Sequence, residues 1–211
     1  MTDHLSQQHI EFAAQMCSRL CHDLISPVGA LSNGLEILAD ETDPEMQGQV
    51  IEMLTQSARV TSAKLRFYRT AFGVTGGFDA DVATRDLKGI AEDFIDAGKA
   101  QLDWQIIGSA MPKSHAKLLF IGLLTAADAL VRGGNLVVTG DATTGYKVAA
   151  TGEKVIVDEE VAALLASQIG PQHQVSRYAP LVLFLSLLPM AAVTHAFEHS
   201  PTEFVLTLTP L

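Results

Sequence analysis

The strongest constraint on the fold is a row of apolar residues that recur every three or four positions near the start of the chain. The row continues from Leu20 through Leu24, Val28, Leu31, Leu35 and Leu38. A spacing of about 3.6 residues places such side chains on one face of a helix. Acidic turn residues at 40–43 and then Pro44 end this helix and begin another, because proline suits the first turn of a helix.

A second amphipathic helix is predicted from Pro44 to Phe72. The connection between the two helices is short, so they must lie antiparallel as a hairpin. Two helices alone cannot enclose both apolar stripes, and the simplest remedy is that two copies of the hairpin pair as a four-helix bundle. The pattern therefore predicts a homodimer.

Glycines at 73, 76 and 77 mark a predicted boundary between two domains, which we place at residues 1–73 and 78–211. In the second domain the patterns predict helices at 81–97, 112–131, 158–168 and 175–188. They predict strands at 101–107, 135–139, 146–150, 192–196 and 203–209. The expected fold class is α+β, with helices packed over a mixed sheet as a sandwich.

Composition narrows the class of protein. Apolar residues make up 48% of the 211 residues, enough to bury a full core. A net charge of -10, with 14 Lys and Arg, argues against nucleic-acid binding. The apolar run at 180–193 is too short to cross a bilayer and we find no export signal, so we expect a cytoplasmic location and no membrane contact. Cys17 and Cys21 are expected to be reduced residues in or near the core.

His22 differs from the other histidines because of where the helix places it. At roughly 100° per residue it points away from both Leu20 and Leu24, so its imidazole should face solvent. A neutral imidazole keeps a lone pair on one ring nitrogen and can attack an activated phosphoryl group. None of the seven histidines has the spacing of a metal-ligand motif, so we predict no metal site.

The neighbours of His22 suit this chemistry. Asp23 can accept a proton or orient the ring, and we assign it an assisting role. Arg19 and Ser26, one turn before and after, lie on the same face and can meet a phosphoryl oxygen. Pro27 should bend the helix just beyond the site. An exposed histidine on a helix is more often only a solvated side chain. The surrounding motif therefore decides whether a function is assigned to His22.

Residues 21–31, with the sequence CHDLISPVGAL, resemble the H-box of sensor histidine kinases. In that motif a phosphoaccepting histidine is followed by an acidic residue, an apolar residue and then a proline. A helical hairpin with this motif, followed by a sandwich domain, is also the layout of the kinases. The resemblance implies that His22 is the phosphoacceptor and that the second domain is ATPase-like.

The nucleotide motifs of those kinases are missing. Gly122 and Ala126 stand where kinases carry asparagines that hold a magnesium ion, and neither can coordinate a metal. Ala150 replaces the acidic residue that reads adenine, although Gly152 is kept. The loop at 170–180, which should cradle the phosphates, retains a single glycine. We therefore expect a degenerate domain that binds no ATP.

This combination is similar to the ChpT family of alphaproteobacterial histidine phosphotransferases, over nearly the whole chain. The resemblance implies a homodimer that takes a phosphoryl group from the receiver domain of a hybrid histidine kinase. The group would then pass from His22 to response regulators that control the cell cycle. It also implies no cofactor of its own, because the partner receiver domain supplies Mg²⁺ and a lysine.

Two alternatives stay open at this point. One is an ATP-dependent sensor histidine kinase with an atypical nucleotide site, which ATP binding would reveal. The other is a non-catalytic dimeric scaffold that uses neither His22 nor nucleotide, and it would work normally after His22→Ala.

Overall fold

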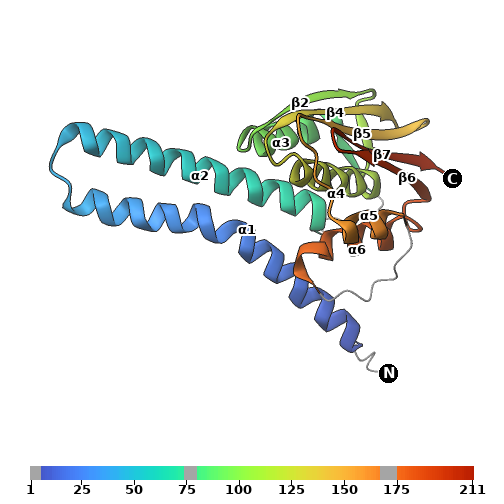
Figure 1. Ribbon diagram of the computed structural model, residues 1–211, viewed down its shortest axis with the longest axis horizontal. Helices are drawn as coiled ribbons and strands as arrows, with labels where there is room; N and C mark the ends of the chain where they lie inside the picture. Colours follow the sequence, from blue (N-terminus) through green and yellow to red (C-terminus); the bar gives the residue numbers. More distant parts are fainter. Residues whose placement is uncertain (1–5, 74–79, 167–174) are drawn as a thin grey trace.

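The computed structural model describes residues 6–73, 80–166 and 175–211. Two long helices open the chain, α1 (Gln7–Asp40) and α2 (Pro44–Phe72), and they lie antiparallel. Their far ends project as an arm from a globular body formed by the remaining elements (Figure 1). The predicted hairpin and the predicted start and end of its second helix are confirmed.

Local sequence explains where the hairpin turns and bends. The Asp43 side chain accepts a hydrogen bond from the Glu45 backbone N–H at 3.0 Å, which satisfies one of the free donors at the start of α2. Pro44 occupies the first turn, where its missing N–H costs nothing. Pro27 lies within α1, and α1 changes direction part-way along its length (Figure 1).

The body contains a five-stranded mixed sheet in the order β2-β4-β5-β7-β6. The strands are β2 (Ala100–Ile106), β4 (Gly134–Asp141), β5 (Gly145–Thr151), β6 (Val193–Ser200) and β7 (Glu203–Pro210). Strands β2 and β4 are parallel, and the other neighbours are antiparallel. A separate antiparallel pair joins β1 (Asp81–Ala83) to β3 (Ala110–Pro112).

Helices cover the face of the sheet that is turned toward the hairpin (Figure 1). They are α3 (Thr84–Asp96), α4 (Lys113–Ala129), α5 (Glu159–Leu165) and α6 (Ala179–Leu187), with the short 3₁₀ helix η1 (Ser176–Tyr178) before α6. Inward-facing residues alternate along the strands, as in the buried pairs Val148–Leu206 and Ala150–Phe204 of β5 and β7. The predicted α+β sandwich is confirmed.

The predicted helix boundaries were wrong in two places. Residues 81–83 form β1 instead of opening a helix, because residues 110–112 pair with them and local propensity cannot reveal such a partner. The predicted helix at 175–188 is divided into η1 and α6, and Pro180 lies in the first turn of α6. The predicted end of the helix at 158–168 lies outside the described residues.

Helix α4 is the centre of the core. Its residues from Ser114 to Leu124 are all buried, and it packs on the sheet on one side and on α2 and α6 on others. The hairpin contributes Phe67, which is fully buried and stacks on Phe94 with ring centroids 3.8 Å apart. The ring of Phe120 in α4 lies 4.8 Å from that of Phe67. One core therefore extends across the predicted domain boundary.

The expectation that Cys17 and Cys21 lie in or near the core was wrong. Both thiols are free and both residues are exposed. The N-terminal half of α1 packs against η1 and α6 on one side, where Met16 and Leu20 are half-buried. The cysteines lie on the uncovered side because no further element of the chain packs there within the described residues.

Gly122 allows α4 and β7 to approach closely. A Cβ atom at this position would lie 2.7 Å from Cδ2 of Leu206, which is itself fully buried. This is the position at which the resemblance to histidine kinases predicts the loss of a metal-holding asparagine. Packing of Leu206 therefore fills the space that a longer side chain would need.

We expect Gly122→Asn to lower the free energy of unfolding by about 2 kcal/mol or more, since it overpacks the core and buries an amide. Gly48→Ala is the matched control, because a Cβ at Gly48 on the exposed side of α2 meets no atom within 4 Å. The free energy of unfolding of this control should rise by roughly 0.5–1 kcal/mol, because alanine has a higher helix propensity than glycine. Chemical denaturation of both variants measures the difference, and a Gly122→Asn variant as stable as the parent would contradict the packing argument.

Candidate functional site

His22 presents its imidazole to solvent from the middle of α1, and 83% of the side chain is exposed. The predicted exposure of this ring is confirmed. Its Nδ1 atom lies 3.1 Å from Oδ1 of Asp23. Within the described residues, no group forms a hydrogen bond with Nε2, so this nitrogen faces open space beside the helix.

Asp23 is the junction of a polar network at the base of the hairpin. Its side chain is only 11% exposed, and its Oδ2 atom accepts hydrogen bonds from the Tyr68 hydroxyl and from Nε of Arg19, each at 2.7 Å. The Lys64 ammonium on α2 donates to the backbone carbonyl of Asp23 at 2.8 Å. Groups from both helices therefore fix this carboxylate in place.

The network keeps Asp23 ionised. Burial by itself raises the pKa of this carboxyl, but hydrogen bonds from Tyr68 and His22 and the charge of Arg19 outweigh burial and hold the pKa below its usual range. Burial, and then the bond to Asp23, raises the pKa of the Tyr68 hydroxyl, which therefore stays a donor. An ionised Asp23 favours the imidazole tautomer that carries its proton on Nδ1. The lone pair then belongs to the exposed Nε2.

Arg19 extends the network to the second domain. Its Nη2 atom donates to Oδ2 of Asp128 on α4 at 3.0 Å, and its side chain is 11% exposed. Burial lowers the pKa of Arg19, but the charges of Asp128 and Asp23 raise it by more, so the guanidinium stays charged. Its predicted contact with a phosphoryl oxygen stays a prediction. So does that of Ser26, which is exposed on α1.

An open cleft of about 520 Å³ lies beside His22. It is lined by Arg19, His22, Asp23, Asp128, Ser176 and Arg177. The last two belong to η1, far along the chain, and sequence reasoning missed them because nothing in a short helical segment reveals its tertiary neighbour. It also missed Tyr68, although the antiparallel register of the hairpin brings the end of α2 alongside the first half of α1.

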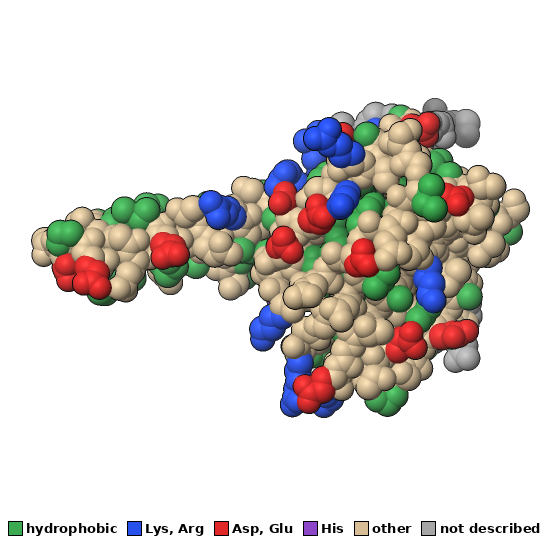
Figure 2. All heavy atoms as spheres, turned by 90° about the horizontal axis from the view of Figure 1, so that it is seen from above, with side chains coloured by type: hydrophobic (Ala, Val, Ile, Leu, Met, Phe, Trp, Pro, Cys, Tyr) green, Lys and Arg blue, Asp and Glu red, His purple; other side chains and the backbone are tan. Residues whose placement is uncertain are grey.

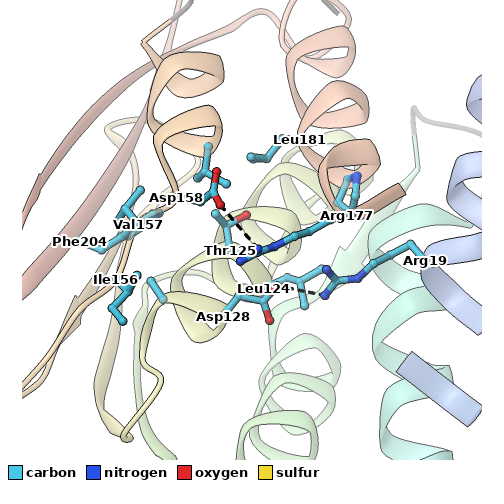
Figure 3. A pocket seen from close by; sticks show the side chains of 13 residues that line it. Arg19, Leu124, Thr125, Asp128, Ile156, Val157, Asp158, Arg177, Leu181 and Phe204 are labelled. Carbon is cyan, nitrogen blue, oxygen red and sulfur yellow. Dashed lines mark hydrogen bonds and ion pairs between the residues drawn. The ribbon is translucent and has the colours of Figure 1, made fainter. Parts of the chain in front are cut away.

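A second cavity, with a volume of about 40 Å³, lies between α4 and the segment that leads into α5. Figure 3 shows Arg19 and Arg177 extending side by side toward it, the first ending at Asp128 and the second at Asp158. Pockets that hold small molecules measure roughly 300–1,000 Å³. At about 40 Å³, this cavity is well below that range.

Other ionisable groups have structural partners. His115 in α4 is buried and its Nε2 lies 3.2 Å from the Ala191 carbonyl, while Nε2 of His195 lies 2.7 Å from the Leu165 carbonyl. Across the described ranges, no group of three or more His, Cys, Asp or Glu residues could hold a metal ion. Nor is any helix there long and apolar enough to span a membrane.

The bond from Tyr68 to Asp23 gives a test of the network. We expect Tyr68→Phe to destabilise the fold by about 1.5–3 kcal/mol at pH 7, because a hydrogen bond to a charged group is lost. The lowered pKa of Asp23 stabilises the fold above the pKa of the unfolded chain, and this contribution is lost as the pH falls through the folded value. The difference between variant and parent should therefore shrink below about pH 4. Urea titrations at several pH values measure it, and a pH-independent difference would count against the network.

Comparison with known proteins gives a family and a fold. The family described as "Histidine phosphotransferase C-terminal domain" matches residues 84–201. The protein phosphotransferase ChpT of Brucella abortus (strain 2308) is 38% identical over 129 residues, which are 61% of this chain and 60% of that protein. The match thus spans less than two thirds of the relative's length.

Among solved structures, a bacterial phosphotransferase superimposes with a TM-score of 0.82 at 28% identity, and the match covers 97% of both chains. The histidine kinase AdeS of Acinetobacter baumannii gives a TM-score of 0.43 at 11% identity, covering 90% of this chain and 96% of that one. Because the family match covers more than half of the residues, the chain belongs to the histidine phosphotransferase C-terminal domain family.

Proposed function

We propose that the chain is a histidine phosphotransferase that accepts a phosphoryl group on Nε2 of His22 and relays it between receiver aspartates in a two-component phosphorelay. One observation carries the proposal: an 83% exposed imidazole whose other nitrogen is held by a fixed, ionised carboxylate. The family and the names of two relatives, both phosphotransferases, support the same class of reaction.

The geometry suits an in-line transfer. The Nε2 lone pair attacks the phosphorus of a receiver aspartyl phosphate, and an N–P bond forms as the P–O bond to the aspartate breaks. The receiver carboxylate leaves with the electron pair of that bond. Positive charge that develops on the ring is stabilised by Asp23 through the Nδ1–H group. Reversal of these steps delivers the phosphoryl group to a second receiver.

The proposal assigns no cofactor to this chain, since the receiver domain would supply Mg²⁺ to neutralise the transferring oxygens. Several observations support it over an ATP-dependent kinase with an atypical nucleotide site. Leu206 fills the space beside Gly122, Ala126 is fully buried, and the adjacent cavity measures about 40 Å³. Hybrid histidine kinases upstream, and a cytoplasmic location, remain parts of the proposal taken from the sequence.

Two substitutions distinguish the proposed nucleophile, His22, from the assisting residue, Asp23. His22→Ala should abolish acceptance of phosphate from a phosphorylated receiver, because the bonding lone pair is lost. Asp23→Asn should leave a transfer that is slower by roughly 10²- to 10⁴-fold, the usual contribution of an assisting acid or base. Transfer of labelled phosphate, resolved by electrophoresis, measures both.

A parallel reaction with labelled ATP and Mg²⁺, without any receiver, is the control for kinase activity and should leave the chain unlabelled. Receiver binding should survive His22→Ala, since an interface of standard size uses about 20–30 residues a side. Normal labelling of the His22→Ala variant would overturn the proposal, whereas a parent protein that binds receivers but accepts no label would favour the scaffold alternative.

We also propose that a second copy of the chain completes the hairpin as a four-helix bundle. Within one chain, Leu24 and Leu31 are half-buried between the helices. Large apolar residues nevertheless remain exposed on the arm, at Val28, Leu35, Ile37, Met46, Ile51 and Met53. Figure 2 shows hydrophobic side chains at the surface of the arm and acidic ones near its tip. Association of two arms would remove this apolar surface from water.

Leu35→Glu should convert the dimer into a monomer while the body stays folded, because Leu35 is 60% exposed within one chain. Burial of a new charge in the bundle is the cause. The control is Asn33→Glu, which adds the same charge on an exposed position about 160° around α1. Sedimentation velocity distinguishes the two, and a parent protein that is monomeric at micromolar concentration would refute the bundle.

A further inference from the structure

We propose that Arg177 of η1 leaves Asp158 and binds the phosphoryl group once His22 is phosphorylated, and so acts as a second-domain residue that holds the phosphorylated intermediate. The inference rests on the proposed function, in that His22 carries the phosphoryl group. It adds a residue of the second domain to a site otherwise built on the hairpin.

The charge balance of the cleft calls for a cation. A phosphoryl group adds about two negative charges. It would lie beside the carboxylate of Asp23, with that of Asp128 on the same cleft wall, in a chain whose net charge is -10. After a receiver dissociates, its Mg²⁺ and lysine leave with it. Cationic side chains of this chain near His22 can then offset the added charge.

Arg19 is already committed to structure. Its Nε atom binds Asp23 and its Nη2 atom binds Asp128, and only 11% of its side chain is exposed. To move toward the phosphoryl group it would have to abandon two carboxylates, one of them buried. Of the described residues that line the cleft, the other cation is Arg177, whose side chain is 59% exposed.

Arg177 is held weakly where it is. Its Nη1 atom lies 3.6 Å from Oδ2 of Asp158. This distance exceeds the range of a hydrogen bond, and exposed ion pairs contribute about 0–1 kcal/mol. Asp158 does not depend on it, because Oδ1 caps α5 through the Glu160 N–H at 3.0 Å and accepts from the Tyr178 hydroxyl at 3.0 Å. Release of Arg177 therefore leaves the local fold intact.

The position of Arg177 makes the exchange a local one. Its side chain lines both the cleft beside His22 and the smaller cavity that Asp158 also lines, so it lies at the boundary between them (Figure 3). Helix η1 packs against α1, which carries His22. A change in the rotamer of Arg177 exchanges the carboxylate of Asp158 for the phosphoryl group as its anionic partner. A guanidinium binds phosphate oxygens in a bidentate, charge-assisted way, which favours the phosphoryl group over a single carboxylate oxygen at 3.6 Å.

The test phosphorylates His22 with phosphoramidate, without any receiver, and follows the ³¹P resonance of the phosphohistidine against pH. Arg177→Ala should raise the pH at which the phosphoryl group titrates by about 0.5–1 unit, because a neighbouring cation favours the dianion. Arg177→Lys should recover part of this shift. Arg132→Ala is the matched control, since Arg132 is also exposed, at 63%, and pairs with Glu153 only at 3.9 Å.

Asp158→Asn keeps the helix cap but loosens Arg177. In this variant the phosphoryl group on His22 should therefore titrate at the parental pH or lower. A titration in Arg177→Ala that coincides with the parent's overturns the inference, as does an Asp158→Asn variant that behaves like Arg177→Ala. An unchanged titration with a raised KM for a receiver would make Arg177 a docking residue instead. If phosphoramidate labels His22 and the shift appears while receivers transfer nothing, the inference stands and the proposed function fails. If His22 accepts phosphate from neither donor, both fail.

Discussion

The partly buried carboxylate of Asp23 connects three parts of the structure that bear on the proposed phosphotransfer. It contacts His22 through Oδ1, and its Oδ2 atom accepts from Tyr68 of the second hairpin helix and from Arg19. Arg19 in turn reaches Asp128 on α4. The orientation of His22, the register of the hairpin and the seating of the second domain are therefore coupled through one side chain. A charged group that is only 11% exposed is stabilised here because each of its oxygens has a partner.

The helices of the second domain pack closely against its sheet. Gly122 brings α4 against Leu206 of β7, and the cavity at the edge of α4 retains about 40 Å³. Its surface residues instead turn toward the hairpin, since Asp128 and Arg177 line the cleft beside His22. The second domain thus supplies charged side chains to the cleft beside the proposed phosphohistidine.

The sequence by itself determined much of this protein. Apolar spacing at about 3.6 residues defined the hairpin, and the Asp43-Pro44 pair placed the start of its second helix, because both signals act over a few neighbouring residues. Helical phase also placed the His22 ring in solvent. The same local reasoning gave the wrong side for Cys17 and Cys21, since exposure depends on which face of α1 another element covers.

Tertiary structure alone decided which distant residues surround His22 and Asp23. Tyr68, Asp128 and Arg177 come from three elements that no local pattern connects, and each reaches the site through packing of helices against α1 or α4. Strand β1 likewise exists only because residues 110–112 lie beside it. Helix phase and capping are short-range effects that a sequence displays directly, whereas ion pairs and strand partners depend on long-range contacts that form only when the whole core has assembled.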